Sequence, residues 1–233
     1  MLSPAVENYL KALYHLEETG QGVATSDLAS RLQVRSASVT NMLQRLAASG
    51  LVSYRRYYGA SLTGEGRRTA TAVIRRHRIL ELFLHRMCAL SLDQVHHEAE
   101  TLEHAASDLF VDALERLLDY PRLDPHGDPI PDREGRLRGD ASIGLALLPE
   151  GARAAVSRVE DSRPEALQHL MKLGLVPGAR FTLLKRMEFD GSLELRVGKT
   201  RVLLSRESAS NVRVTPVRGA GAPRTRARKR SAS

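Results

Sequence analysis

The sequence is poor in cysteine and in long apolar runs, and both shortages restrict what the protein can be. Its single cysteine, Cys88, excludes an internal disulfide and a cysteine-rich zinc site. No apolar stretch approaches the roughly 18–20 residues of a membrane-spanning helix, and the start Met1-Leu2-Ser3-Pro4 lacks the charged and then apolar plan of a signal peptide. With 233 residues and 42% hydrophobic side chains, the chain can bury one large core or several small ones. We expect a folded cytoplasmic protein.

Acidic residues are absent from residues 218–233, which concentrates the positive charge of the chain there. Six of the eight net positive charges belong to this segment, namely Arg218, Arg224, Arg226, Arg228, Lys229 and Arg230. The rest of the chain is only mildly basic. We expect a basic, disordered tail that either solubilises the protein or adds sequence-independent affinity for nucleic acid.

Residues 1–63 carry the pattern of a winged helix-turn-helix, a DNA-binding domain. The apolar spacing predicts a helix from Pro4 to about Glu18, a second short helix that Thr25-Ser26 caps, and a third from Ser36 or Ala37 to Gly50. Two short extended runs around a turn follow within 51–62. Three helices before a basic hairpin is the order of this domain, although a polar exposed helix beside an ordinary hairpin is the alternative.

The third helix is the candidate recognition helix because its outer face is short and polar. Side chains of this kind can reach base edges in the major groove. The candidate DNA contacts on this helix and the turn before it are Arg35, Ser36, Ala37, Ser38, Thr40, Asn41 and Gln44. Arg55 and Arg56 of the hairpin suit contacts to phosphate.

Residues 64–132 are predicted to form a helical dimerisation and metal-binding domain. We expect a long helix over 64–87, a second from a Ser91-x-x-Gln94 capping box to about Ser107, and a third over 108–120. Helices packed behind a DNA-reading domain are typical of a dimer interface, so the protein is expected to be a homodimer. From residue 142 the pattern changes to short strands with one helix, which predicts a small β-barrel over 142–217 after a linker at 133–141. The fold class is therefore mainly α with a small β part.

Histidine and glutamate gather on the two first helices of this central domain. His77 and Glu81 are four residues apart, so they share one side of the long helix. On the next helix a single stripe comprises His96, Glu100, Glu103 and His104. Imidazole and carboxylate donors without cysteine favour Mn(II) or Fe(II) over structural zinc. The alternative is that these residues are merely solvated pairs on helix surfaces.

These motifs resemble the diphtheria toxin repressor and manganese transport regulator family of metal-activated bacterial transcriptional repressors. The resemblance extends to about Pro216 and is carried by segments 77–81, 96–104, 125–131 and 173–178. It implies an SH3-like fold for the C-terminal barrel. It also implies a primary metal site and an ancillary one. The primary site would use Glu100, Glu103 and His104 with Asn8 and Glu7, and the ancillary site would use His77, Glu81 and His96. Candidates to close the ancillary site from the SH3-like domain are Glu165, Gln168 and His169.

Two positions depart from one or other branch of that family. Glu100 stands where iron-sensing members carry cysteine, as it does in the manganese sensors, and a hard oxygen donor favours Mn(II). The manganese sensors place an aspartate and a glutamate on the first helix, whereas this chain has Asn8 and Lys11. Asn8 can still offer a carbonyl oxygen, but Lys11 argues against a second adjacent ion built in the same way.

The resulting hypothesis is a DNA-binding repressor of metal-uptake genes that Mn(II), or alternatively Fe(II), activates. Metal would lock the DNA-binding domain to the dimerisation domain, and the homodimer would read a pseudo-palindromic operator in double-stranded DNA. No membrane partner and no catalysis are expected. Two other hypotheses stay open at this point: a metal-independent winged-helix regulator that responds to a small organic ligand, and a metallohydrolase that uses the same His and Glu residues.

Overall fold

The protein is described from a computed structural model. The structure describes residues 2–17, 22–137, 141–159 and 164–217. The predicted basic tail and residues 138–140 of the predicted linker lie outside them. The chain divides into two compact units, Met1–Asp140 and Ala141–Ser233.

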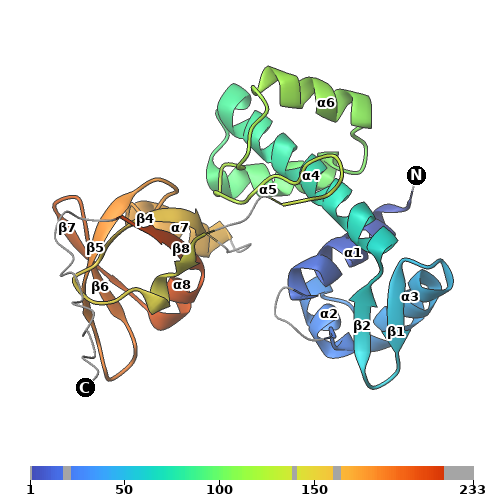
Figure 1. Ribbon diagram of the computed structural model, residues 1–233, viewed down its shortest axis with the longest axis horizontal. Helices are drawn as coiled ribbons and strands as arrows, with labels where there is room; N and C mark the ends of the chain where they lie inside the picture. The colour runs from blue at the N-terminus through green and yellow to red at the C-terminus, as the bar shows by residue number, and fades with distance from the viewer. Residues whose placement is uncertain (1, 18–21, 138–140, 160–163, 218–233) are drawn as a thin grey trace, which may run out of the picture. The chain divides into compact units, whose positions relative to one another are not determined.

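Three helices and a hairpin begin the first unit (Figure 1). They are α1 (Pro4–Glu17), α2 (Thr25–Leu32), α3 (Ser36–Ala48), β1 (Val52–Arg55) and β2 (Gly59–Leu62). Apolar side chains at helical spacing meet in one core, which includes Leu10, Leu13, Leu28, Leu43 and Leu46. The element order is the one predicted for a winged helix-turn-helix. One detail differs: α2 begins at Thr25 itself, and Ala24 rather than a polar side chain is the residue before it.

Strand β2 is held against the segment before α2, close to the turn of the hairpin. Val23 pairs with Ala60, and the two residues exchange backbone hydrogen bonds of 2.8 and 2.9 Å. Gly59 has a φ of +93°, and a Cβ there would lie 2.7 Å from the Val23 carbonyl oxygen. Only glycine fits this close approach. The residues that precede the exposed turn are therefore held in place by the segment before α2.

Helix α4 (Gly64–Cys88) links this domain to two further helices, α5 (Leu92–Leu102) and α6 (Asp108–Leu117) (Figure 1). Thr63 caps α4, since its side chain accepts a hydrogen bond from the Gly66 N–H. The first half of α4 contributes Ala70 and Ile74 to the N-terminal core. Its second half joins a separate core that includes Ile79, Leu80, Leu82, Val95, Ala99, Val111 and Leu114.

The predicted start of α5 is confirmed, but its predicted end is wrong. The Ser91–Gln94 capping box is present, whereas the helix ends at Leu102 and not near Ser107. Ser107 has the extended backbone of an N-cap, and its side chain accepts a hydrogen bond from the Phe110 N–H. A residue that caps α6 cannot also continue α5, so a turn separates the two helices.

The segment after α6 folds back on α4. Asp124 Oδ1 accepts hydrogen bonds of 2.8 Å from the N–H groups of His126 and Asp128, and the Arg78 side chain donates to the Pro129 carbonyl at 2.6 Å. The first part of the predicted linker also packs on this unit, because Arg133 forms a 2.6 Å ion pair with Asp112.

The second unit is a six-stranded antiparallel sheet with short helices. Along the sheet the strands follow the order β3-β8-β4-β5-β6-β7. Their bounds are β3 (Ile143–Gly144), β4 (Arg153–Val159), β5 (Arg180–Arg186), β6 (Leu193–Val197), β7 (Thr200–Leu204) and β8 (Val212–Pro216). The helices are η1 (Leu145–Leu147), α7 (Pro164–Lys172) and α8 (Arg206–Ser210). Alternate strand residues fill one core, as the predicted small β module requires.

Among the described residues, no helix combines the length and the apolar character that crossing a membrane requires.

Candidate metal centre and DNA interface

Three donors from two helices converge between α4 and α5. His77 and Glu81 lie one turn apart on α4, with His77 Nε2 2.9 Å from Glu81 Oε1. His96 on α5 places Nδ1 3.0 Å from the same oxygen and 3.1 Å from His77 Nε2. One donor atom from each residue lies within 4.8 Å of those of the other two. We call this set (His77, Glu81, His96) the α4–α5 pole; it is the set expected at the ancillary site.

A histidine that the sequence did not single out extends the α4–α5 pole. His126, in the loop after α6, is buried and has Nε2 3.7 Å from Glu81 Oε1. Burial lowers the pKa of His126, which favours the neutral ring that a metal ligand needs. Its loop carried part of the family resemblance, and that was the signal available in the sequence.

A second set joins α1 to the turn that follows α5. Glu7 Oε2 lies 2.6 Å from His104 Nδ1, and His104 Nε2 lies 3.5 Å from Glu103 Oε1. Lys11, one turn after Glu7 on α1, has Nζ 2.7 Å from that same Glu103 oxygen. We call this set (Glu7, Lys11, Glu103, His104) the α1 pole.

Glu103 and His104 lie just after α5, although the sequence predicted them to be part of that helix. Because α5 ends at Leu102, Glu103 and His104 belong to the turn after it. The Glu103 N–H still donates to the Ala99 carbonyl at 2.8 Å, so helical geometry continues just far enough to point Glu103 inward. Its side chain is completely buried.

His77 and Glu100 connect the two poles. His77 Nδ1 lies 2.6 Å from Glu103 Oε2, while its other nitrogen faces Glu81. Glu100, which is half exposed, places Oε1 3.6 Å from His96 and 3.7 Å from Lys11. The two predicted sites therefore form one continuous network, with His77 as the shared member.

On α1, Glu7 and Lys11 contact the network, and these two residues lie on either side of Asn8 in the sequence. Asn8, the expected ligand, is half-buried, whereas Glu7 and Lys11 make the contacts. Arg76 of α4 adds a further cation, with Nη2 2.7 Å from Glu7 Oε1.

The charges of the network are coupled. Burial opposes a charged His77 ring, but the Glu81 carboxylate and the Glu103 hydrogen bond outweigh it and raise the pKa of His77 to about 9. Burial also opposes ionisation of the two glutamates, yet contact with His77 lowers the pKa of both Glu81 and Glu103. At neutral pH the structure thus holds an imidazolium between two carboxylates. The proton on His77 occupies a lone pair that a metal ion would need.

The predicted DNA contacts on α3 lie on its solvent face. Val39, Leu43 and Leu46 are buried in the core. Thr40 is half-buried and hydrogen-bonds the Ser36 carbonyl at 3.0 Å. The other predicted contacts are exposed: Arg35, Ser36, Ala37, Ser38, Asn41 and Gln44.

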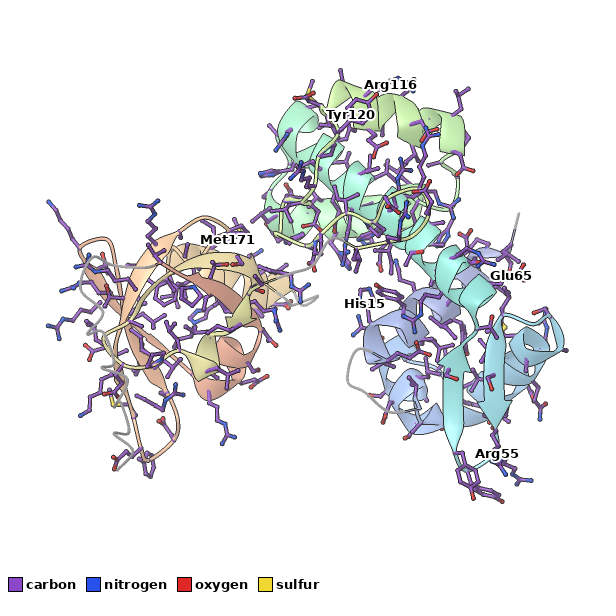
Figure 2. All side chains as sticks on the ribbon, viewed as in Figure 1. His15, Arg55, Glu65, Arg116, Tyr120 and Met171 are labelled. Atoms are coloured by element: carbon purple, nitrogen blue, oxygen red, sulfur yellow. The ribbon has the colours of Figure 1, made fainter. Side chains whose placement is uncertain are left out.

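The tip of the hairpin presents two arginines stacked on two tyrosines. The Arg55 guanidinium lies 4.6 Å from the ring centre of Tyr58, and that of Arg56 lies 5.0 Å from the ring centre of Tyr57. Both rings are exposed, Tyr57 by 90%, and Figure 2 shows Arg55 at the far end of the hairpin. The two arginines were predicted as DNA contacts and the two tyrosines were not, although all four are consecutive in the sequence.

Helix α6 and the residues after it expose an apolar face. Its members include Leu109, Phe110, Leu117 and Tyr120, and Figure 2 shows Arg116 and Tyr120 at the end of this helix. Exposed apolar side chains grouped on one helix are typical of a protein–protein contact.

Comparison with known proteins accounts for these features together. Residues 1–60 match the iron dependent repressor N-terminal DNA binding domain, and residues 63–132 match the iron dependent repressor metal binding and dimerisation domain. Over 229 residues the chain is 31% identical to the iron-dependent repressor IdeR of Mycobacterium leprae (strain TN), covering 93% of this chain and 99% of the relative. The chain belongs to the iron-dependent repressor family.

Solved structures that resemble this chain over most of its length agree with this assignment. A manganese-dependent transcriptional repressor in complex with manganese is 34% identical, with a TM-score of 0.84 over 91% of this chain and all of that chain. ScaR with bound Cd2+ is 31% identical, with a TM-score of 0.81 over 91% of this chain and 99% of that chain.

Membership of the iron-dependent repressor family confirms the predicted resemblance and fold class. The protein is a DNA-binding transcriptional regulator and not an enzyme, which removes the metallohydrolase hypothesis. Residues 143–216 match the FeoA domain, in agreement with the predicted SH3-like module. Within that module Glu165, Gln168 and His169 are exposed on α7, and their role as ligands stays a prediction.

Proposed function

We propose that this protein is a metal-activated repressor of metal-uptake genes, with Mn(II) as the activating ion and Fe(II) as the alternative. It would act as a homodimer on a pseudo-palindromic operator, and we expect it in the cytoplasm because its target is DNA. The observation that supports this function most directly is the network that joins α1 of the DNA-binding domain to α4 and α5.

The residues of the network suit a divalent ion of intermediate hardness. Their donors are imidazole nitrogens and carboxylate oxygens, and Cys88 is exposed at the end of α4. Nitrogen and oxygen donors of this kind fit Mn(II) and Fe(II), and the carboxylate of Glu100 at the position of an iron sensor's cysteine favours Mn(II). In this proposal the α4–α5 pole, extended by His126, holds one ion.

A second ion would be held by the α1 pole together with Glu100 of α5. Its proposed ligands are Glu100, Glu103 and His104, completed from α1 by Glu7 or Asn8. A bound divalent ion supplies the positive charge that displaces the His77 proton and relieves repulsion among the carboxylates.

The chain's own residues convert this binding into an orientation of the DNA-binding domain. Glu7 faces the network from α1, while Leu10 and Leu13 of the same helix are buried in the core that also holds α3. Fixing Glu7 against His104 and Glu103 therefore fixes α3 and the hairpin relative to α4. Metal then favours the orientations in which the two α3 helices of a dimer reach successive major grooves.

The two remaining surfaces have separate roles in this proposal. The exposed face of α3 would read bases, and the stacked Arg55 and Arg56 of the hairpin would contact phosphates. The apolar face of α6 would form the dimer contact, which sets the distance between the two α3 helices.

The decisive experiment is binding of the purified protein to its own upstream DNA, titrated with Mn(II), Fe(II) and Zn(II) against a chelator. We expect binding to appear with Mn(II) and to disappear on chelation. DNA binding that ignores the chelator but responds to a metabolite would reject the proposal and favour the metal-independent regulator.

A pair of matched variants assigns the site. Glu103→Gln should abolish metal-dependent DNA binding and leave the dimer folded, because it removes the carboxylate shared by His77, His104 and Lys11. Glu98→Gln is the control, since Glu98 lies on α5 and is exposed. Unchanged Mn(II)-dependent binding in Glu103→Gln, with dimer formation checked by light scattering, would refute the assignment.

A further inference from the structure

The α1 pole already contains a cation of its own. Lys11 is largely buried, with 14% of its side chain exposed, and its Nζ lies 2.7 Å from Glu103 Oε1. The same ammonium group lies 3.7 Å from Glu100 Oε1. A positive charge attached to α1 therefore sits between two carboxylates that the proposed function assigns to a metal ion.

The choice of residue is informative. Lys11 is the only lysine in residues 1–171, where arginine is used at all the other Lys or Arg positions. The arginine guanidinium is planar and spreads its charge over three nitrogens. The lysine ammonium is a compact charge at the end of a flexible chain, so it is closer to a metal ion in shape and charge distribution. Arg76 occupies the neighbouring part of the pole, where it pairs with Glu7.

The balance of charge at this pole favours one divalent ion over two. Glu7, Glu100 and Glu103 provide the carboxylates, and Lys11 and Arg76 neutralise two of those charges by direct contact. A further divalent ion beside them would meet the Lys11 ammonium within a few ångströms, in a buried setting where like charges repel strongly.

We propose that Lys11 is a tethered cation that holds α1 to Glu103 without metal and restricts the α1 pole to a single divalent ion. The inference rests on the proposed function for the second half of this statement only. The first half depends on the Lys11–Glu103 contact, which joins residues 92 positions apart.

The test uses the full-length dimer and four substitutions. Lys11→Met keeps the apolar stem and removes the charge, Lys11→Glu reverses the charge, and Lys11→Arg keeps it. Lys199→Met is the matched control, since Lys199 is exposed in the second unit. The measurements are thermal unfolding in chelator, and the number and affinity of bound Mn(II) ions by native mass spectrometry and calorimetry.

Lys11→Met should unfold at a lower temperature than Lys11→Arg in chelator, and should bind Mn(II) at least about tenfold more tightly because a repelling charge has gone. Lys11→Glu should bind one more Mn(II) per protomer than the natural chain. The proposal would also be supported if the unfolding temperature of Lys11→Met were lowered in chelator and restored by Mn(II). Unchanged stoichiometry and affinity in Lys11→Met and Lys11→Glu would overturn it.

The two proposals fail in different ways. A natural chain that binds no Mn(II) would reject the proposed metal switch, while the comparison of Lys11→Met with Lys11→Arg in chelator still measures the α1 link. A natural chain with an intact Mn(II) switch but equal melting of those two variants would reject the Lys11 link alone.

Discussion

The two poles of the histidine–glutamate network differ in what holds their residues together. The α4–α5 pole comes from two helices that share an apolar core, with Ile79, Leu80, Val95 and Ala99 buried around it. The α1 pole instead joins a helix of the DNA-binding domain to a turn after α5. The first pole is thus set by packing within one core, whereas the second depends on contacts between two.

Because of this difference, we expect the two poles to contribute differently to metal affinity and to the metal-dependent change in DNA binding. In the proposed function, an ion at the α4–α5 pole would meet donors that are already close together and would change little elsewhere. An ion at the α1 pole would link two cores, so its binding energy would shift the orientation of α3. We therefore expect metal affinity to depend on both poles and the DNA response to depend mainly on the α1 pole.

The largest expected effect comes from removing one carboxylate at each pole in turn. Glu7→Gln should retain Mn(II) at the α4–α5 pole and weaken the Mn(II)-dependent gain in operator affinity by about 100-fold, near the upper end of usual coupling energies. Glu81→Gln should lower Mn(II) affinity and reduce that gain by only about tenfold. Calorimetry for metal and fluorescence anisotropy for DNA measure the two quantities separately. A larger loss of coupling in Glu81→Gln would invert the comparison.

An intermediate effect concerns pH, and it involves His77, which both poles share. The pKa of His77 is raised from 6.5 to about 9, so the folded metal-free protein holds a proton there that must leave before the nitrogen can bind metal. Mn(II) affinity should therefore rise with pH between about 6.5 and 9, by up to about tenfold per pH unit for one displaced proton.

The stability of the metal-free protein should change in the opposite direction. Because the folded pKa lies above the unfolded value, the His77 contribution is complete below pH 6.5 and is lost as pH rises through about 9. Thermal unfolding in chelator and anaerobic Mn(II) titration at three pH values check both trends. His85→Gln is the control, since His85 bonds the Leu90 carbonyl instead. An Mn(II) affinity that stays constant across this range would exclude His77 as the titrating ligand.

The sequence predicted the α4–α5 pole better than the α1 pole for a physical reason. Helical spacing puts His77 beside Glu81 whatever else the chain does, and the apolar stripe of α5 sets the face on which His96 lies. No local rule brings Lys11 to Glu103 or His126 to Glu81, because these contacts depend on how separate elements pack. The resemblance supplied the α1 ligands but favoured Asn8, whereas Glu7 makes the contact.

The fold shows the same division between local and distant information. Helices with a clear apolar period were predicted within a few residues, but the end of α5 was misplaced because the capping role of Ser107 was overlooked. The strands β3 and β8 and helix α8 were not predicted. They are short, and β8 joins the sheet beside β4, far from it in sequence, so its partner could not be read from neighbouring residues.

The smallest expected effect comes from the hairpin, which should change DNA affinity without altering either pole. Tyr58→Leu removes the ring on which Arg55 stacks and should weaken operator binding about two- to fivefold, as expected for an exposed cation–π contact. Arg55→Gln should weaken binding to operator and random DNA alike, and should reduce the salt dependence by about one phosphate contact. Phe189→Leu, remote from the hairpin in sequence and exposed in the second unit, serves as the aromatic control. In both hairpin variants the Mn(II) concentration for half-saturation without DNA should equal that of the natural chain, because the tip lies beyond both cores. A shifted Mn(II) midpoint would mean that the hairpin takes part in the metal switch, and the division between the two poles would then be incomplete.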